Sequence, residues 1–137
     1  MGLSNARFEV KDVTTLGEVG RYDLITAFDA IHDQARPATA LFNIATALRP
    51  EGTFLMQDIV GSSHVHNNLD HPIVPFLYTI SCMHYTTPSL PQDGDGLGTM
   101  WGDEKALEML AAIGFNNGVV KQLPHDFQNN YYICPKD

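Results

Sequence analysis

The sequence predicts an α/β fold, in which a mainly parallel sheet is completed by a pair of antiparallel strands. Three observations support this prediction. Residues 22–28 and 53–58 are short, mostly apolar runs of the kind found in strands buried on both faces. Residues 37–48 between them carry apolar side chains at helical spacing, which indicates a crossover helix. Two more strand-like runs near the carboxyl end are joined by a segment rich in turn residues.

The amino-terminal elements follow in order along the chain. Residues 7–12 alternate between apolar and charged side chains, with Phe8 and Val10 on one face, which predicts a strand. The apolar run at 22–28 predicts the next strand. Pro37 suits the first position of the helix that follows. Because the last two strands are separated by a helix, a right-handed crossover between parallel neighbours is expected.

The carboxyl-terminal elements are a helix and a strand pair. Asp103 is positioned to cap the helix, and Gly114 to end it in a left-handed conformation. Strands are predicted at residues 119–123 and 131–134. The link at 124–130 suits an antiparallel pair at the edge of the sheet.

Residues 61–102 interrupt this alternation. They hold four prolines and several glycines, and they predict one helix, from Phe76 to about His84. A long irregular insertion of this kind is more often a lid or a pocket wall than a plain connection. We therefore interpret residues 1–137 as a single partial domain in which residues 61–102 form a lid or substrate-pocket insertion.

Composition excludes several classes of protein. The chain has 137 residues with 44% hydrophobic and 18% charged residues, which is typical of a globular domain. Its net charge of −8 disfavours a nucleic-acid partner. No apolar run approaches the about 18 residues of a membrane span, and no secretory signal is visible, so the cytoplasm is the expected location. Cys82 and Cys134, far apart, support neither a disulfide framework nor a cysteine zinc site.

Acidic side chains end the predicted strands. In an open parallel sheet, ligands bind beyond the carboxyl ends of the strands, and Asp12, Asp29, Asp33 and Asp58 all lie there. His32 lies between two of these acids and can serve as a base near neutral pH. The alternative is helix capping, by Asp33 for the helix near residue 37 and by Asp12 for a short turn.

Three segments together resemble a known family. Residues 8–13, 22–33 and 48–58 read FEVKDV, YDLITAFDAIHD and LRPEGTFLMQD. In order and spacing they resemble strands three to five of class I S-adenosylmethionine-dependent methyltransferases, and the third segment is the most specific. The later helix and strand pair agree with that family. The resemblance covers about the whole chain but only the carboxyl-terminal part of the family's domain, so it implies a partial Rossmann-like methyltransferase sheet.

The resemblance also implies roles for individual residues in binding the cofactor S-adenosylmethionine. Asp12 would accept a hydrogen bond from the adenine amino group, and the amide of Val13 would reach a ring nitrogen. Phe28 and Asp29 would line the cofactor cleft. The catalytic candidates, His32 and Asp33, would face the reactive side of the cofactor or the substrate.

The amino-terminal binding elements of that family have no counterpart before Phe8. These are a glycine-rich turn after strand one and an acid that ends strand two. Gly94, Gly96 and Gly98 lie in the insertion, not between a strand and a helix, and cannot supply the turn. The expected function is therefore methyl transfer to a small molecule by a fragment that is inactive alone. A non-catalytic binding or dimerisation module, or a half-enzyme completed by another chain, are the alternatives.

Strand order in the family implies a partner. Strand one normally lies between strands two and four, so without it the strand at residues 22–28 has an open edge with unpaired peptide groups. We expect a homodimer through this edge, or through the strand at residues 7–10.

The insertion supplies candidate substrate-binding residues. Tyr78, His84 and Trp101 could line a pocket for an apolar or aromatic methyl acceptor, and packing in the core is the alternative.

No metal site is predicted. A histidine cluster in the insertion matches no zinc module. Residues 93–104 resemble a calcium loop, but Leu97 offers no side-chain oxygen at a ligand position. The histidine cluster consists of His64, His66 and His71, with Asp70.

Overall fold

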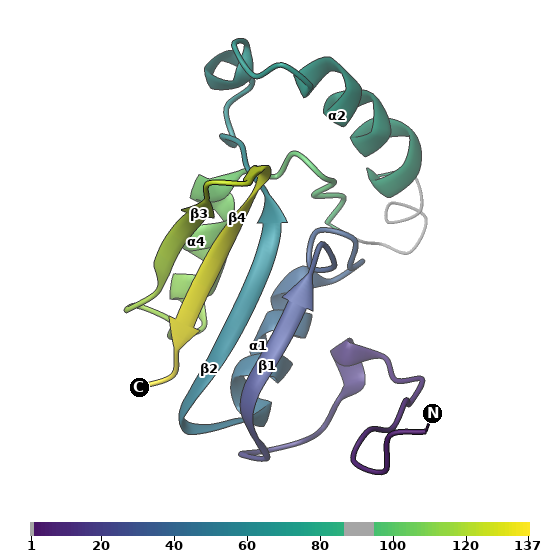
Figure 1. Ribbon diagram of the computed structural model, residues 1–137, viewed down its shortest axis with the longest axis vertical. Coiled ribbons are helices and arrows are strands. Elements are labelled where there is room, and N and C mark those ends of the chain that lie inside the picture. Colours follow the sequence, from purple (N-terminus) through teal and green to yellow (C-terminus); the bar gives the residue numbers. More distant parts are fainter. Residues whose placement is uncertain (1, 87–94) are drawn as a thin grey trace.

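The computed structural model describes residues 2–86 and 95–137, and the side chains of residues 84–86 lie outside this description. One sheet holds four strands in the order β1-β2-β4-β3 (Figure 1). The strands are β1 (Tyr22–Phe28), β2 (Leu48–Ile59), β3 (Val119–Leu123) and β4 (Asp126–Pro135). The helices are α1 (Pro37–Ala47), α2 (Val74–Ile80) and α4 (Asp103–Ala112), with the short η1 (Val13–Thr15), η2 (Val65–Asn68) and η3 (Ser81–Thr86).

The predicted α/β fold is confirmed. Strands β1 and β2 are parallel, with Leu24 beside Thr53 and Phe28 beside Gln57, and α1 connects them. Strand β4 is antiparallel to both β2 and β3. The parallel strands therefore end at the same edge of the sheet, which is where the acidic residues of the candidate site lie.

Helices α1 and α4 pack on the same face of the sheet, behind the strands in Figure 1. Phe54 of β2 is fully buried, and its ring stacks on that of Phe115 with centroids 6.0 Å apart. Leu41 of α1 and Leu110 of α4 complete this layer. Pro37 is the first residue of α1, as predicted, since its fixed φ suits a helix start.

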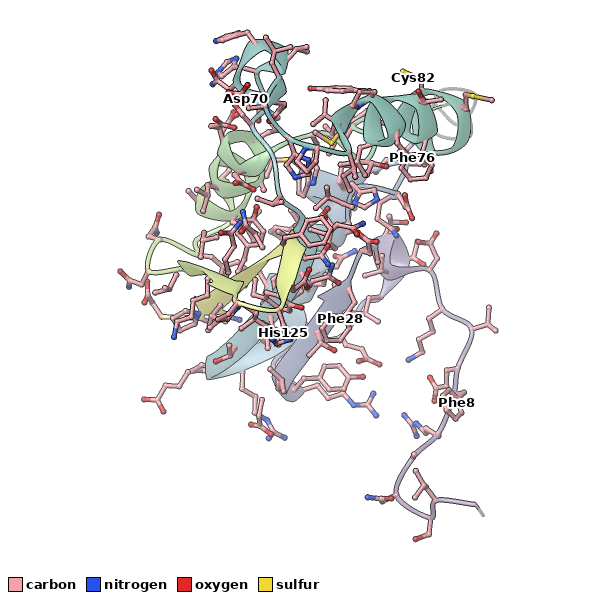
Figure 2. All side chains as sticks on the ribbon, turned by 45° about the horizontal axis from the view of Figure 1, so that its top comes forward. Phe8, Phe28, Asp70, Phe76, Cys82 and His125 are labelled. Carbon is pink, nitrogen blue, oxygen red and sulfur yellow. The ribbon has the colours of Figure 1, made fainter. Side chains whose placement is uncertain are left out.

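The segment at residues 7–12 was predicted to be a strand, and that prediction is wrong. The segment has no regular secondary structure and pairs with no strand in the described chain, and Phe8 and Val10 are fully exposed. Its alternation is that of a strand, but no described strand lies beside it to accept its hydrogen bonds. Figure 2 shows Phe8 far from the sheet.

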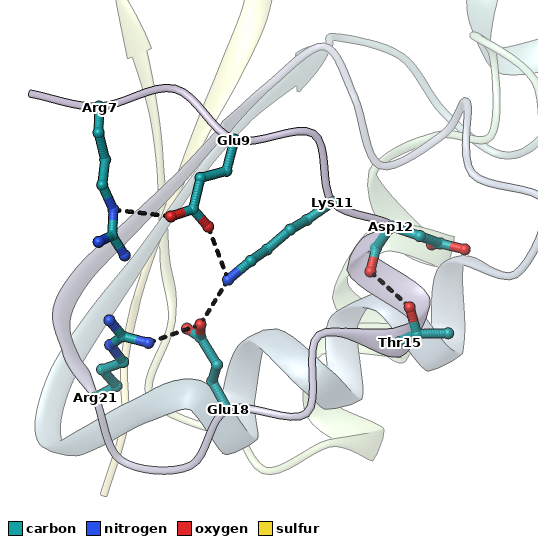
Figure 3. Close-up of polar contacts among 7 residues, drawn as sticks. All are labelled: Arg7, Glu9, Lys11, Asp12, Thr15, Glu18 and Arg21. Atoms are coloured by element: carbon teal, nitrogen blue, oxygen red, sulfur yellow. Dashed lines mark hydrogen bonds and ion pairs between the residues drawn. The ribbon is translucent and has the colours of Figure 1, made fainter.

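Salt bridges join this amino-terminal arm to the loop before β1 (Figure 3). Lys11 lies between Glu9, at 3.0 Å, and Glu18, at 2.9 Å. Glu18 also pairs with Arg21, and Arg7 pairs with Glu9, each at 2.9 Å. Exposed pairs of this kind contribute about 0–1 kcal/mol each, so they position the arm without fixing it strongly.

Two boundaries near the carboxyl end also differ from prediction. Gly102, with φ +83°, is the capping residue of α4, and Asp103 is its first residue. Asp103 cannot cap because its carboxylate accepts hydrogen bonds from Tyr132 at 2.6 Å and Asn130 at 2.8 Å. The link between β3 and β4 is shorter than predicted, since β4 already begins at Asp126. Gly114 has a positive φ after α4, as predicted.

The insertion at residues 61–102 lies beyond the carboxyl ends of β1 and β2 in its described parts (Figure 1). Helix α2 begins at Val74, slightly before the predicted Phe76, and continues into η3. A small apolar cluster joins it to the sheet through Ile59, Leu77 and Met100. The amide of Asp95 donates to the carbonyl of Ala35 at 2.9 Å, so the chain returns beside the turn after β1. Its role as a lid stays a prediction.

Among the described residues, no helix combines the length and the apolar character needed to cross a membrane.

Candidate functional site

His32 lies buried between two carboxylates where β1 and β2 end. Its Nδ1 is 2.8 Å from Oδ1 of Asp58, and its Nε2 is 3.2 Å from Oδ1 of Asp33. The side chains of His32 and Asp58 are 1% and 0% exposed, whereas that of Asp33 is 37% exposed. Because β1 and β2 are parallel neighbours, their carboxyl ends lie at the same edge of the sheet, which brings His32 and Asp58 together. The three side chains thus form a chain of contacts from the core to the surface, with Asp33 as its accessible end.

This arrangement favours the protonated form of His32. Burial pulls the pKa of the imidazole down, but the hydrogen bond and charge of Asp58, with the charges of Asp33 and Asp29, outweigh burial and raise the pKa above its usual 6.5. Burial raises the pKa of the Asp29 carboxyl, and the charge of His32 offsets part of that rise. A protonated His32 beside three carboxylates leaves the cluster with net negative charge.

Asp58 is held by the backbone as well as by His32. Its Oδ1 also accepts a hydrogen bond from the amide of Ile59 at 2.8 Å. Its Oδ2 is buried and has no hydrogen-bond partner among the described residues. A buried unsatisfied oxygen costs about 1–3 kcal/mol, so the carboxylate is retained at a cost in stability.

Asp29, His32 and Asp58 offer ligand atoms within 4.8 Å of one another, a spacing that a metal ion could use. However, each ring nitrogen of His32 already faces a carboxylate. The same carboxylates raise the pKa of His32, so the arrangement favours a protonated imidazole over a metal ligand at this position.

The predicted histidine cluster does not converge. The rings of His64 and His66 stack with centroids 5.7 Å apart. Within the described part of the chain, they form no metal-binding group with His71 or Asp70.

A cavity of about 640 Å³ opens beside β1, between that strand and η1. Asp12, Val13 and Phe28, three of the four predicted cofactor residues, all line it. The fourth, Asp29, lies instead in the acidic cluster. Ala30 in the turn after β1 also lines the cavity, so the cavity and the cluster are neighbours along the chain.

The capping alternative holds for Asp12 and fails for Asp33. Asp12 precedes η1, and its Oδ1 accepts from the amide and the hydroxyl of Thr14 at 2.8 and 2.7 Å, which lowers the pKa of the carboxyl. Figure 3 shows the further contact from Thr15 to the Asp12 carbonyl. Helix α1 is preceded by Arg36 with no side-chain cap, so Asp33 faces His32 instead.

The residues present fit only part of S-adenosylmethionine. The cavity is mainly apolar, as a purine ring requires, and Asp12 provides a hydrogen-bond acceptor at its rim. Both described side-chain contacts of Asp12 use Oδ1, so Oδ2 is available to a ligand. Asp12 is the only carboxylate that lines this cavity in the described chain, so no second acid is positioned for the ribose hydroxyls. The cavity therefore fits the adenine end of the cofactor, but its described residues do not fit the ribose end.

The three predicted substrate residues lie in different surroundings. Trp101 is 5% exposed and belongs to the main core. Tyr78 is partly buried beside Val74 and Leu77, and its hydroxyl accepts a hydrogen bond from Asn68 at 3.1 Å. His84 lies in η3, and its side chain is outside the described part. A shared pocket for these residues stays a prediction.

Asp58 is the site residue that the predicted catalytic pair omits. Its position at the carboxyl end of a strand is the signal in the sequence, and it applies equally to Asp12. Only the parallel pairing of β1 and β2 shows that Asp58, rather than Asp12, reaches His32.

A comparison with family models places the chain. Residues 1–111 match the model described as a methyltransferase domain. The match covers most of the sequence, and the chain belongs to this family of methyltransferase domains. S-adenosylmethionine is the cofactor of that family, in agreement with the resemblance drawn from the sequence.

Similar solved structures share the fold. An O-methyltransferase family protein from Burkholderia thailandensis has a TM-score of 0.65 at 11% identity, over 95% of this chain and 35% of its own. PigF with SAH has a TM-score of 0.63 at 19% identity, over 92% of this chain and 34% of its own. The trans-methyltransferase CalH in complex with SAH has a TM-score of 0.63 at 18% identity, over 98% and 37%.

The chain therefore spans about a third of the length of these three proteins. A comparison with curated proteins gives no match.

Proposed function

We propose that this chain is the carboxyl-terminal part of an S-adenosylmethionine-dependent methyltransferase that acts on a small molecule. The observation that carries the proposal is the buried His32–Asp58 pair, at 2.8 Å, at the carboxyl ends of two parallel strands and beside a cavity that can hold a purine. The matched family and the lengths of the similar structures support the assignment and the partial character of the chain.

The acidic cluster suits the chemistry of methyl transfer. When bound, S-adenosylmethionine supplies a methyl group on a positively charged sulfur. The net negative charge around Asp29, Asp33 and Asp58 favours a cation at this end of the sheet. A hydroxyl or amine acceptor must lose a proton when it is methylated, so a residue that can receive that proton would be needed at this end of the sheet.

We assign to Asp33 the role of receiving that proton. Its carboxylate is the accessible member of the chain of contacts, and His32 behind it holds its orientation at 3.2 Å. Asp58 keeps His32 protonated and oriented, so it is a positioning residue. The remaining contribution of the chain is to align the reactants and exclude water.

Binding of SAH to the isotope-labelled chain tests the proposal. We expect millimolar SAH to shift the backbone NMR signals of Asp12, Val13 and Phe28, with no saturation at micromolar concentration, because no second carboxylate lines the cavity in the described part of the chain. Asp12→Ala should abolish these shifts, and Asp70→Ala, an exposed acid far from the cavity, should leave them unchanged. The absence of shifts at the cavity in the wild type contradicts the nucleoside site. Micromolar affinity in calorimetry contradicts the partial character.

A non-catalytic binding or dimerisation module is the second candidate. It is favoured by the burial of His32 and by the missing ribose acid. The neighbouring DNA separates the two candidates. An upstream reading frame that encodes a strand, a glycine-rich turn and a helix supports a fragment or one half of a split enzyme, and its absence supports the module.

The expected homodimer belongs to this proposal as well. Strand β1 lies at the edge of the described sheet and pairs only with β2, so one row of its peptide groups is open to a second chain. The cytoplasmic location expected from the sequence stays part of this proposal.

A further inference from the structure

A second cavity, of about 210 Å³, lies between α4 and the hairpin of β3 and β4. We call it the α4 cavity, and its walls include Leu107, Ala111, Phe115, Val120, Tyr132 and Cys134. It shares no lining residue with the cavity beside β1. The α4 cavity is therefore separate from the proposed nucleoside site and from the acidic cluster.

The α4 cavity lies at the edge of the sheet opposite to β1. Strand β3 forms that edge, with α4 behind it at the left of Figure 1. The strand that the family resemblance implies beside residues 22–28 would add at the β1 edge, so it would leave the α4 cavity as it is. All of the lining residues fall between positions 107 and 134, a continuous part of the described chain.

The side chains around the α4 cavity offer little to water. None of them carries a formal charge. The Tyr132 hydroxyl donates to Asp103 at 2.6 Å, and the Asn116 amide donates to the Gly114 carbonyl at 3.4 Å. Burial raises the pKa of the Cys134 thiol to about 11, so this group stays a neutral, weak donor at neutral pH. Because a buried water needs about two to four polar partners, the walls favour an apolar occupant.

The size and the composition of the walls suit one aromatic ring. An apolar cavity of about 150 Å³ can stay dry and bind benzene, and the α4 cavity is larger than that. The rings of Phe115 and Tyr132 and the sulfur of Cys134 line it, and an aromatic ring makes favourable contacts with both kinds of group. Leu107 and Val120 are 42% and 37% exposed, so a small molecule can enter from the solvent without unfolding of α4.

We propose that the α4 cavity binds a small uncharged molecule built on a single aromatic ring. The ring gains dispersion contacts with the side chains of the walls, and it brings no polar group that would need a partner there. The proposal does not rest on the proposed function, because one helix and one hairpin build the α4 cavity without any residue assigned to S-adenosylmethionine.

Titration of the whole chain with benzene, followed by methyl NMR, tests the proposal. In the wild type, we expect the methyl signals of Leu110 and Val120 to shift and to saturate at millimolar benzene. Intermolecular NOEs should connect benzene to the same methyl groups. The methyl signals of Val65, which is 61% exposed and lines neither cavity, should not move.

Two neighbouring alanines of α4 provide matched variants. Ala111 lines the α4 cavity and Ala112 does not, although both are exposed. Leucine favours helices, so Ala111→Leu and Ala112→Leu should both keep α4. The larger side chain at position 111 takes up cavity volume, so benzene should bind at least about tenfold more weakly to Ala111→Leu and with unchanged affinity to Ala112→Leu.

Two outcomes overturn the proposal. If the wild type shows neither saturable shifts nor NOEs, the α4 cavity does not take an aromatic ring. Equal affinity of Ala111→Leu and the wild type places the bound ring elsewhere. The wild-type titration needs no variant, so the test stands even where a substituted chain does not fold. Failure of SAH to shift Asp12 contradicts only the proposed function, and failure of benzene to shift Val120 contradicts only this proposal.

Discussion

Asp58→Asn is the substitution that most directly probes the site, since it removes one charge and almost no volume. Asp58 is fully buried, and His32, its partner at 2.8 Å, is 1% exposed. The raised pKa of His32 favours an imidazolium beside the Asp58 carboxylate in the wild type. The amide oxygen that replaces the carboxylate would still accept the hydrogen bond from Nδ1 of His32, but it would no longer balance the imidazolium charge.

The expected loss of stability follows from that geometry. A hydrogen bond to a charged group contributes about 1.5–3 kcal/mol, and breaking a buried ion pair by removing one partner costs about 3–5 kcal/mol. Because the amide keeps the hydrogen bond and Asp33 still contacts Nε2, we expect a loss of about 3 kcal/mol at about pH 6. Asp23→Asn is the matched control, since its carboxylate is 80% exposed and pairs with Arg49 at the surface. It should cost less than about 1 kcal/mol.

The loss should also depend on pH. The folded state raises the pKa of His32 above its usual 6.5, so it binds the proton more tightly than the unfolded state. The resulting stabilisation is complete below the unfolded pKa and is lost as the pH rises through the folded pKa. The difference between wild type and Asp58→Asn should therefore shrink as the pH rises from about 6.5 through the raised pKa of folded His32.

Urea unfolding at several pH values measures the stability difference, and NMR titration measures the pKa of His32 in both proteins. In Asp58→Asn that pKa should fall below the wild-type value, because burial, the largest single influence, then meets less opposition. A loss that does not vary with pH, or an unchanged pKa of His32, refutes the assignment of a charged buried pair.

Three further substitutions test the two ends of α4. Gly102→Ala should destabilise by about 3 kcal/mol, because φ is +83° and a Cβ would lie 2.1 Å from the amide nitrogen of Ser63. Gly114→Ala, with φ +101° and nothing within 4 Å, should cost only about 1 kcal/mol, and equal losses in urea unfolding would contradict the clash. Hydrogen bonds from the Ser63 amide and the Ser62 hydroxyl lower the pKa of Glu104 to about 2. Its stabilisation is present above 4.5 and is lost as the pH falls toward 2, so Glu104→Gln should flatten acid unfolding in that window, by under about 1 kcal/mol for this exposed group.

The spacing of apolar residues along the chain is sufficient to predict the helices and strands that bury one regular face. Helix α1 and strands β1 and β2 could be predicted because their apolar spacing matches the core that they share. Residues 7–12 have the same quality of pattern, yet form no strand. A strand needs a neighbour to accept its hydrogen bonds, and the alternation of Phe8 and Val10 carries no information about whether that neighbour is present.

The sequence predicts where the residues of the candidate site lie, but not which of them contact one another. Placing acids at strand ends follows from the fold class. Which acid pairs with His32 depends on the register of β1 against β2. A shift of one residue would turn Asp58 to the opposite face of the sheet. Asp103 shows the same limit. Its sequence context favours a cap, but Tyr132 and Asn130, far along the chain, take both of its oxygens.

The position of β1 at the edge of the sheet connects the cavity with the unpaired edge of that strand. Leu24 and Phe28 of this edge strand line the cavity, and each is 57% exposed. Any polypeptide that packs there, whether a second copy or the rest of a methyltransferase domain, must cover these two side chains. It would thereby exclude water from the cavity beside Asp12, where added burial strengthens a hydrogen bond to a purine. Completion of the sheet and completion of the nucleoside site are therefore coupled, because the same strand provides the wall of both.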